Sequence, residues 1–309
     1  MGSPASGSDG SRLQVTVPDV AAAKRASGRP PLVMVTAYDA CQARIADRAG
    51  VDLILVGDSV GMVCLGLEDT LGVTLEDMVH HVRAVARARP RALLVADMPW
   101  MSYHTSPEEA VANAAQLVRA GARAVKLEGG AKRLPAVEAI LSAEIPVMGH
   151  LGLTPQSVHA LGGFRVQAKE LDQARRLAED ASALAAAGCF ALVLEGVPDV
   201  VAGRVTEELA IPTIGIGAGQ WCDGQVMVFH DLLGLEDKAA PKFVRRYAQL
   251  GAAATEAIAR FAADVRQGRY PSDAESYHAR DEVAASLIGL GGPPAPGEAD
   301  TPGRHAGRR

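Results

Sequence analysis

The sequence predicts a (β/α)8 barrel formed by one parallel α/β domain. Short apolar runs alternate with amphipathic helical patterns about eight times without a break in composition, as in a parallel sheet whose strands are joined by helices. The runs are apolar throughout, which is expected for strands covered on both faces. A doubly wound open sheet is the alternative, but it would bind its ligand at one switch point. Here charged candidates follow four different runs, and this spread favours a closed ring.

The strands are predicted from runs rich in Val, Leu and Ala that end at glycine, proline or a polar residue. Each run is short enough for a barrel strand and is followed by a turn signal. The predicted strands occupy 31–37, 51–57, 91–97, 122–129, 145–150, 189–196, 211–219 and 225–231.

Helical patterns fill the segments between these runs. The first covers about 40–49. The next begins near Thr74, which forms a capping-box pattern with Asp77 three residues on. Another follows Ser106, a favourable N-cap, with Pro107 in the first turn. Further helical sequence is predicted over about 132–143, 172–187, 197–209 and 241–267.

The two ends of the chain differ in composition from its centre. Residues 1–11 are rich in Gly, Ser and Pro, and residues 289–309 contain almost no apolar side chains, so both are predicted to be disordered tails. Between them, residues 12–288 are predicted to form a single barrel domain that ends in C-terminal helices.

Composition argues against several classes of protein. The 309 residues include 31 basic and 36 acidic side chains, for a net charge of −5. No basic block lies outside the tail and aromatic residues are few, which argues against a nucleic-acid partner. The N-terminus lacks the apolar core of a signal peptide, and no run approaches the roughly 20 apolar residues of a membrane span. A cytoplasmic protein without a membrane partner is predicted.

The four cysteines are interpreted as buried free thiols. They are widely separated, form no CxxC pair and have no histidine at zinc-ligand spacing. Cys189 lies in a strand-like run and Cys41 on a helical pattern, where cysteine is often buried. The two others are Cys64 and Cys222.

Four predicted strands end on a carboxylate, and this is the most informative feature of the chain. The runs LILVGDS, LLVADMP, AVKLEGG and ALVLEGVP place Asp58, Asp97, Glu128 and Glu195 at or just past strand ends. A carboxylate desolvated there without a partner is costly. Because parallel strands end on one face of a barrel, these groups would repel each other unless a positive charge lay among them. A divalent cation with oxygen ligands, with one carboxylate free to move protons, meets both demands.

Each candidate also has a simpler explanation. Asp58 in GDSVG suits a turn, and Asp97 could merely end a strand before Pro99. Lys126 and Glu128 could form an ion pair on an exposed edge. Their spacing of two, however, places both on one face of their strand, with the apolar neighbours facing the helices. Both then point into the barrel mouth, where a buried lysine would suit an anionic substrate.

Two further residues are expected at the same face. Glu195 ends a strongly apolar run, which is expected to raise its pKa and to suit a general base. His150 follows the fifth strand in MGHLGLTPQ and is a possible additional site residue, although a single histidine is more often structural. The other histidines are interpreted as structural or solvated, namely His80 and His81, or left undecided, namely His104, His159 and His230.

The glycines of GIGAG at 215–219 have two explanations that the sequence leaves open. Their exposed backbone N–H groups resemble a phosphate-cradling loop. Close approach of the backbone to any ligand, or tight packing at a strand end, explains them equally.

Several segments together resemble the ketopantoate hydroxymethyltransferase family. They include VTAYDACQARIADRAGVDLILVGDSVGM, ADMPWMSY, AVKLEGG, GHLGLTPQSVHALGG, VLEGVP, IPTIGIGAG and HDLLGL, in order over about 12–280. The resemblance implies a barrel of the phosphoenolpyruvate/pyruvate type and the first step of pantothenate synthesis. The implied reaction transfers a hydroxymethyl group from 5,10-methylenetetrahydrofolate to 3-methyl-2-oxobutanoate through a Mg²⁺-stabilised enolate. Its products are 2-dehydropantoate and tetrahydrofolate.

The resemblance also implies roles for individual residues and a homo-oligomer, commonly a decamer. Asp58, Asp97 and Glu128 match the family's Mg²⁺-site carboxylates, acting directly or through bound water. Glu195 matches the proton acceptor. Either Glu195 or His150 could protonate the departing folate nitrogen. The positions that would hold the oxo acid are Asp58, Ser59, Asp97 and Lys126.

Two other functions compete with this one. A Mg²⁺-dependent carbon–carbon lyase or mutase of the same barrel type would need a catalytic cysteine or an equivalent acid in a mobile loop. Cys64 in the predicted loop 57–73 is a candidate for that role. A non-catalytic barrel is the other alternative, but it would have no physical reason to keep a charged cluster at its strand ends.

Overall fold

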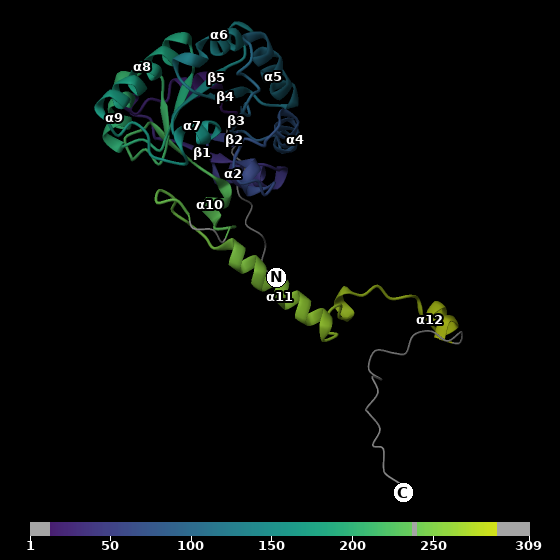
Figure 1. The fold of residues 1–309 in the computed structure, drawn as a ribbon. Helices are drawn as coiled ribbons and strands as arrows, with labels where there is room; N and C mark the ends of the chain where they lie inside the picture. The colour runs from purple at the N-terminus through teal and green to yellow at the C-terminus, as the bar shows by residue number, and fades with distance from the viewer. Residues whose placement is uncertain (1–12, 237–239, 289–309) are drawn as a thin grey trace. The chain divides into compact units, whose positions relative to one another are not determined.

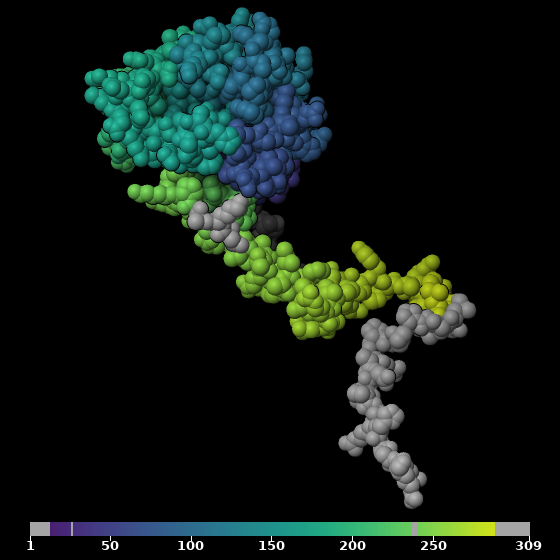
Figure 2. All heavy atoms as spheres, in the orientation of Figure 1, coloured from purple at the N-terminus to yellow at the C-terminus, as the bar shows by residue number. Residues whose placement is uncertain are grey.

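The computed structural model describes residues 13–236 and 240–288. The predicted disordered tails, 1–11 and 289–309, lie outside these residues. In the space-filling view of Figure 2, the purple-to-green part of the chain that carries the barrel forms one closely packed body.

The predicted (β/α)8 barrel is confirmed (Figure 1). Eight parallel strands close into a ring in chain order, with the first strand hydrogen-bonded to the last. Every strand overlaps one of the predicted apolar runs. The strands are β1 Leu32–Thr36, β2 Leu53–Val56, β3 Leu93–Asp97, β4 Ala124–Glu128, β5 Val147–Gly152, β6 Ala191–Glu195, β7 Thr213–Ile216 and β8 Gly224–Met227.

Helices surround the strands, as Figure 1 shows. The α-helices are α1 Val17–Ala21, α2 Ala40–Ala49, α3 Val60–Val63, α4 Leu75–Ala86, α5 Pro107–Ala120, α6 Leu134–Ser142, α7 Val158–Leu161, α8 Leu171–Ala187, α9 Asp199–Glu208 and α10 Phe229–Leu233. The helices α2, α4, α5, α6, α8 and α9 bury their apolar faces against the outside of the barrel, which is why their sequences are amphipathic, whereas α1 packs against the interior core. Short 3₁₀ turns are η1 Arg25–Ser27, η2 Ala131–Arg133 and η3 Pro155–Ser157.

Both predicted helix caps are confirmed. The Thr74 side chain accepts a hydrogen bond from the Asp77 backbone N–H, and the Asp77 carboxylate accepts one from the Thr74 backbone N–H, which completes the capping box of α4. At the start of α5, the Ser106 hydroxyl accepts a hydrogen bond from the Glu109 N–H. These bonds satisfy backbone donors that the helix itself leaves unpaired.

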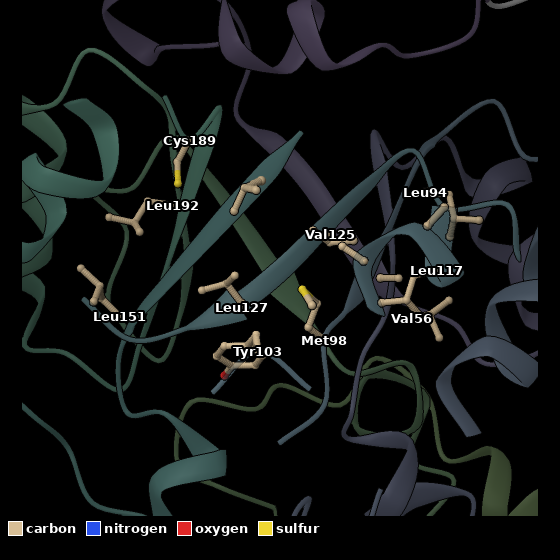
Figure 3. Packing of buried hydrophobic residues seen from close by; sticks show 14 of the residues in the cluster. Val56, Leu94, Met98, Tyr103, Leu117, Val125, Leu127, Leu151, Cys189 and Leu192 are labelled. Atoms are coloured by element: carbon tan, nitrogen blue, oxygen red, sulfur yellow. The ribbon is translucent and has the colours of Figure 1, made fainter. Parts of the chain in front are cut away.

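Side chains of the strands alternate between two apolar cores, one inside the barrel and one between barrel and helices. In β4, Ala124 belongs to the interior core, whereas Val125 and Leu127 pack under the helices, where Figure 3 shows them. Lys126 and Glu128 alternate with these two residues. Their side chains therefore point to the barrel interior, as predicted from their spacing.

Two predicted segments are wrong in extent. The apolar run at 225–231 is not one strand, because β8 ends at Met227 and α10 begins at Phe229. The Phe229 backbone N–H donates to the Thr36 hydroxyl of β1, which fixes the start of this helix instead of extending the ladder. The helical sequence predicted from 241 begins only at Leu250.

The chain divides into two compact units, one ending at Gly251 and one beginning at Ala252. The second contains most of α11 Leu250–Arg266, with η4 Asp273–Glu275 and α12 Asp281–Ile288. Whether residues 12–288 fold as one domain stays a prediction. Among the described helices, none is both long enough and apolar enough to cross a membrane.

The interpretation of the cysteines is half confirmed. Cys189 and Cys222 are buried free thiols, but Cys41 and Cys64 are exposed. Cys41 is the second residue of α2 and lies on its outward face, so the helical pattern alone did not decide its burial.

Candidate active site

The structure brings the predicted charged residues together where the strands end. Asp58 follows β2, Asp97 ends β3, Lys126 and Glu128 lie on β4, and His150 lies on β5. Each of these five residues is at most 5% exposed. Parallel register explains their meeting, since Asp97 pairs with Lys126 and Glu128 pairs with His150 across neighbouring strands.

Short contacts link these residues into one cluster. The Lys126 Nζ atom lies 2.8 Å from Asp97 Oδ1 and 3.1 Å from His150 Nδ1. The same His150 nitrogen lies 3.3 Å from Glu128 Oε1, and His150 Nε2 lies 3.3 Å from Glu195 Oε2. Glu195, at the end of β6, is the most accessible member, with 18% of its side chain exposed. The cluster thus spans four adjacent strands.

Lys126 is charged within this cluster. Burial disfavours an ammonium group, but the charges of Asp97, Glu128 and Asp58 outweigh it and raise the pKa of Lys126 above its ordinary value. A buried lysine surrounded by carboxylates is a permanent positive charge at neutral pH.

For Asp58 and Asp97, in contrast, the positive charge of Lys126 does not outweigh burial. Burial, followed by the negative charges of Asp97 and Glu128, raises the pKa of Asp58 well above its usual range, although Lys126 and Gln156 oppose the change. Burial also raises the pKa of Asp97, against the effect of Lys126. Negative charge therefore exceeds what Lys126 neutralises, and a cation placed among these carboxylates would stabilise them.

The donor set fits a hard divalent cation such as Mg²⁺. Asp97 Oδ1 is buried without a hydrogen bond of good geometry, although it is within ion-pair distance of Lys126. Within the described residues, no three His, Cys, Asp or Glu side chains are already arranged to hold one ion. Mg²⁺ tolerates this, because it commonly takes one or two carboxylates and completes its shell with water or substrate oxygens. One or two of Asp58, Asp97 and Glu128 as direct ligands, with the rest reached through water, fit that description.

His150 connects the buried carboxylates to the accessible one. Burial and the charge of Lys126 lower the pKa of its imidazole, but the contacts with Glu128 and Glu195 prevail and raise it to about 9. The Nδ1 atom of the ring faces Glu128 and Lys126, and its Nε2 atom is within ion-pair distance of Glu195 but makes no hydrogen bond of good geometry. His150, which the sequence left as only a possible site residue, thus lies between the candidate base Glu195 and the buried cluster.

Ser59 lies beside the cluster, one residue after Asp58. Its hydroxyl is 2.8 Å from the Tyr38 hydroxyl. Gly57 permits this approach, since a Cβ atom there would lie 2.8 Å from Ser59 Oγ and 3.4 Å from Asp97 Oδ2. A larger residue at 57 would displace two predicted site residues.

Sequence reasoning missed two members of the site, Gln156 and Tyr103. Gln156 is buried in η3, the 3₁₀ turn that follows β5, and its side-chain amide donates to Asp58 Oδ2 at 2.8 Å. The Tyr103 hydroxyl donates to Gln156 Oε1 at 2.5 Å, and Figure 3 shows Tyr103 beside Leu127 and Met98. The one signal in the sequence is the position of TPQ just past a strand end, on the face that carries the charged residues.

The remaining histidines lie outside these contacts. His80 is exposed, and His81 Nδ1 lies 2.7 Å from the Tyr38 carbonyl oxygen, which confirms the interpretation of both as solvated or structural. Burial lowers the pKa of His104 to about 4 and lowers that of His230. Both rings are therefore neutral at physiological pH.

The glycines at 215–219 have a packing explanation. Gly219 has a φ of +77°, and a Cβ atom there would approach Asp199 Cβ to 2.3 Å. Gly217 has a φ of +61° and lies against the Phe243 ring. Steric demand alone accounts for both positions.

Solved structures of other barrel enzymes share this fold at low sequence identity. A phosphonopyruvate hydrolase has a TM-score of 0.55 at 15% identity, covering 90% of this chain and 96% of its own. A 2,3-dimethylmalate lyase, described as a member of the PEP mutase/isocitrate lyase superfamily, has a TM-score of 0.51 at 18% identity, covering 85% and 94%. At these identities the likeness shows the fold alone.

Curated relatives are much more similar in sequence. The enzyme named 3-methyl-2-oxobutanoate hydroxymethyltransferase from Methylobacterium sp. (strain 4-46) is 59% identical, over 85% of this chain and 91% of its own length. The enzyme of the same name from Pelobacter propionicus is 52% identical, over 86% and 98%. The family profile described as ketopantoate hydroxymethyltransferase matches residues 14–273. The resemblance of the motifs is therefore confirmed, and the chain belongs to the ketopantoate hydroxymethyltransferase family.

Proposed function

We propose that this enzyme transfers a hydroxymethyl group from 5,10-methylenetetrahydrofolate to 3-methyl-2-oxobutanoate, giving 2-dehydropantoate and tetrahydrofolate. The observation that carries the proposal is the division of the strand-end carboxylates into two sets. Asp58, Asp97 and Glu128 are buried together around Lys126, whereas Glu195 lies apart and more accessible. One set can hold an anionic substrate and a cation, and the other can move a proton.

Glu195 is proposed as the base that removes the C3 proton of the oxo acid. It lies on β6, two strands away from Lys126, and its side chain is open enough to reach a substrate. The His150 imidazole lies 3.3 Å from one carboxylate oxygen of Glu195, which leaves the other to take the proton. After the proton is abstracted, the enolate carbon forms the new C–C bond with the one-carbon unit of the folate. Both C–N bonds of that unit break, and one water supplies the hydroxyl oxygen of the product, so that tetrahydrofolate leaves.

Lys126 is proposed to neutralise the negative charge of the oxo acid. Its ammonium group is fixed by Asp97 at 2.8 Å and is preorganised for a substrate carboxylate or an enolate oxygen. Asp58, Ser59 and Asp97 complete the proposed substrate contacts. Because these groups are held before the reaction starts, little reorganisation is needed as charge develops.

Asp58, Asp97 and Glu128 are proposed to hold Mg²⁺, directly or through water. When bound, the ion supplies a Lewis acid that stabilises an enolate oxygen. A complex of the similarly folded phosphonopyruvate hydrolase contains oxalate and Mg²⁺, and its 14% identity makes this a comparison of folds only. In this protein, the proposal is supported by the excess of buried negative charge around Asp58, which a cation would balance.

The lyase or mutase alternative receives no support from the one thiol considered for it. Cys64 is exposed next to α3. Desolvation, together with the charges of Asp39 and Glu236, raises the pKa of this thiol to about 11. It stays protonated at neutral pH and is a poor nucleophile.

We also propose a cytoplasmic homo-oligomer, with a decamer as the expected size. The outer face of β1 supports association, because Val33 is 48% exposed there and Ile45 of α2 is 49% exposed beside it. Strands of a barrel are normally covered on both faces, and a second copy of this chain would cover them. Light scattering after gel filtration gives the mass: a monomer would contradict this proposal.

The proposed reaction is tested by incubating the purified enzyme with 3-methyl-2-oxobutanoate, 5,10-methylenetetrahydrofolate and Mg²⁺, and measuring 2-dehydropantoate by mass spectrometry. Product is expected only in the complete mixture. If the oxo acid is consumed without the folate donor, the enzyme is a lyase or hydrolase and the proposal is wrong. If no substrate is consumed in any mixture, the barrel is non-catalytic.

A further inference from the structure

We propose that Gln156 is the positioning residue that sets the carboxylates of this site, and that Tyr103 acts on the site through Gln156. The inference rests on the proposed function, since it concerns the same carboxylates. It extends the site to two residues that do not touch the substrate but determine where Asp58 and Glu128 lie.

Gln156 contacts the ends of three neighbouring strands at once. It is 6% exposed. Its backbone N–H donates to Glu128 Oε2 at 3.0 Å, and its side-chain Nε2 donates to Asp58 Oδ2 at 2.8 Å and to the Met98 carbonyl oxygen at 3.0 Å. Its Oε1 accepts the Tyr103 hydroxyl proton at 2.5 Å. One residue therefore ties together two of the three carboxylates proposed to hold the cation.

The direction of these hydrogen bonds is fixed. The Nε2 atom faces a carboxylate and a carbonyl, which only accept, so the amide cannot be turned over. The Gln156 oxygen must then accept, which makes the Tyr103 hydroxyl the donor. The hydroxyl oxygen in turn lies 3.2 Å from the Glu128 backbone N–H and accepts from it. The chain runs one way, from Glu128 through Tyr103 and Gln156 to Asp58, and each bond polarises the next.

This series of hydrogen bonds opposes the repulsion among the buried carboxylates. Asp58 is close enough to Asp97 for its backbone N–H to donate to Asp97 Oδ2 at 3.1 Å. Without a side-chain donor, the Asp58 carboxylate would gain by rotating away from Asp97 and Glu128. The Gln156 amide holds Oδ2 in place and leaves Oδ1 for a ligand. Outer hydrogen bonds of this kind orient carboxylate ligands before the metal arrives.

The test measures Mn²⁺ affinity by electron paramagnetic resonance, with Mn²⁺ alone and no substrate. Gln156→Met keeps the side-chain length but removes the amide, and we expect it to weaken Mn²⁺ binding about 10- to 100-fold. Tyr103→Phe removes only the hydroxyl and keeps the buried ring, so this variant should fold. It should weaken Mn²⁺ binding by about threefold to tenfold. In the double variant the loss should equal that of Gln156→Met alone, because Tyr103 acts through Gln156.

The matched control is Thr206→Val, which removes a buried hydroxyl that donates to Ala202 at the opposite end of the barrel. It should leave Mn²⁺ affinity unchanged. Wild-type affinity in Gln156→Met, or independent multiplying losses in the double variant, would overturn the inference while the proposed function stands. Absence of Mn²⁺ binding in the wild-type enzyme would contradict the proposed function itself.

Discussion

The Nε2 atom of His150 lies 3.3 Å from the Oε2 atom of Glu195, which ends the neighbouring strand. The other nitrogen of the ring faces the buried Glu128 carboxylate at the same distance. A single imidazole therefore separates the carboxylate proposed to move a proton from those proposed to hold the cation. This arrangement lets the two functions be removed independently.

Glu195→Gln should abolish exchange of the C3 proton of 3-methyl-2-oxobutanoate in deuterated buffer, because an amide cannot accept that proton. The expected loss is about 10²–10⁴-fold, with Mn²⁺ affinity unchanged. Glu179→Gln, the same change at an exposed position of α8, serves as control and should exchange normally. Wild-type exchange in Glu195→Gln would remove Glu195 as the base.

Asp97→Ala should shift the Mg²⁺ dependence of activity to higher concentrations. The substitution removes a carboxylate from the proposed metal site and also the partner of Lys126 at 2.8 Å. We expect an increase of at least about tenfold in the Mg²⁺ concentration for half-maximal activity, as found for loss of metal-site groups. Saturation at the wild-type concentration of Mg²⁺ would show that Asp97 is not part of the site.

Lys126→Met should destabilise the protein in the absence of Mg²⁺. Removing one partner of a buried ion pair costs about 3–5 kcal/mol in the free energy of unfolding, because the remaining charge stays buried. Urea denaturation measures this loss, and added Mg²⁺ should recover part of it by binding the native state. Lys132→Met, the same change at an exposed residue, should stay within about 0.5 kcal/mol of wild type. Equal stability of the two variants would show that Lys126 is not paired.

The four thiols should react with maleimide at very different rates. Cys41 is exposed and should be labelled first at pH 8. The pKa of Cys64 is raised to about 11, so its thiolate fraction, and its labelling rate, should rise about tenfold per pH unit between pH 8 and 10. Burial raises the pKa of Cys189 to about 12 and also raises that of Cys222. Both should react only after denaturation; peptide mapping that finds them labelled in the native protein would contradict their burial.

The charged residues of the site could be predicted because their positions follow from strand geometry. Parallel strands bring their carboxyl ends to one face, so residues at the ends of the second, third, fourth and sixth runs had to meet. The spacing of two between Lys126 and Glu128 similarly determined that both point inward. In these cases the sequence period alone places the side chain.

Gln156 and Tyr103 could not be predicted in the same way. Tyr103 lies on the loop after β3 and Gln156 in the short 3₁₀ turn η3 after β5. No period determines the direction of a side chain in such segments, and their partners are up to 98 residues away in sequence. The predicted end of the last strand, β8, was wrong for a related reason. A short apolar run alone does not distinguish a strand from a helix. The change from strand to helix at Phe229 depends on the Thr36 hydroxyl of β1, which is far away in sequence.

Exchange of the C3 proton of 3-methyl-2-oxobutanoate in deuterated buffer, with and without Mg²⁺ and in the absence of folate, tests the central claim most directly. The wild-type enzyme should exchange this proton in a Mg²⁺-dependent manner, because Glu195 would remove it while Lys126 and bound Mg²⁺ would stabilise the enolate, without any need for the folate donor. The assay is repeated with tetrahydrofolate, which covers the case in which folate must bind first. Absence of exchange under both conditions would contradict enolate formation at this site.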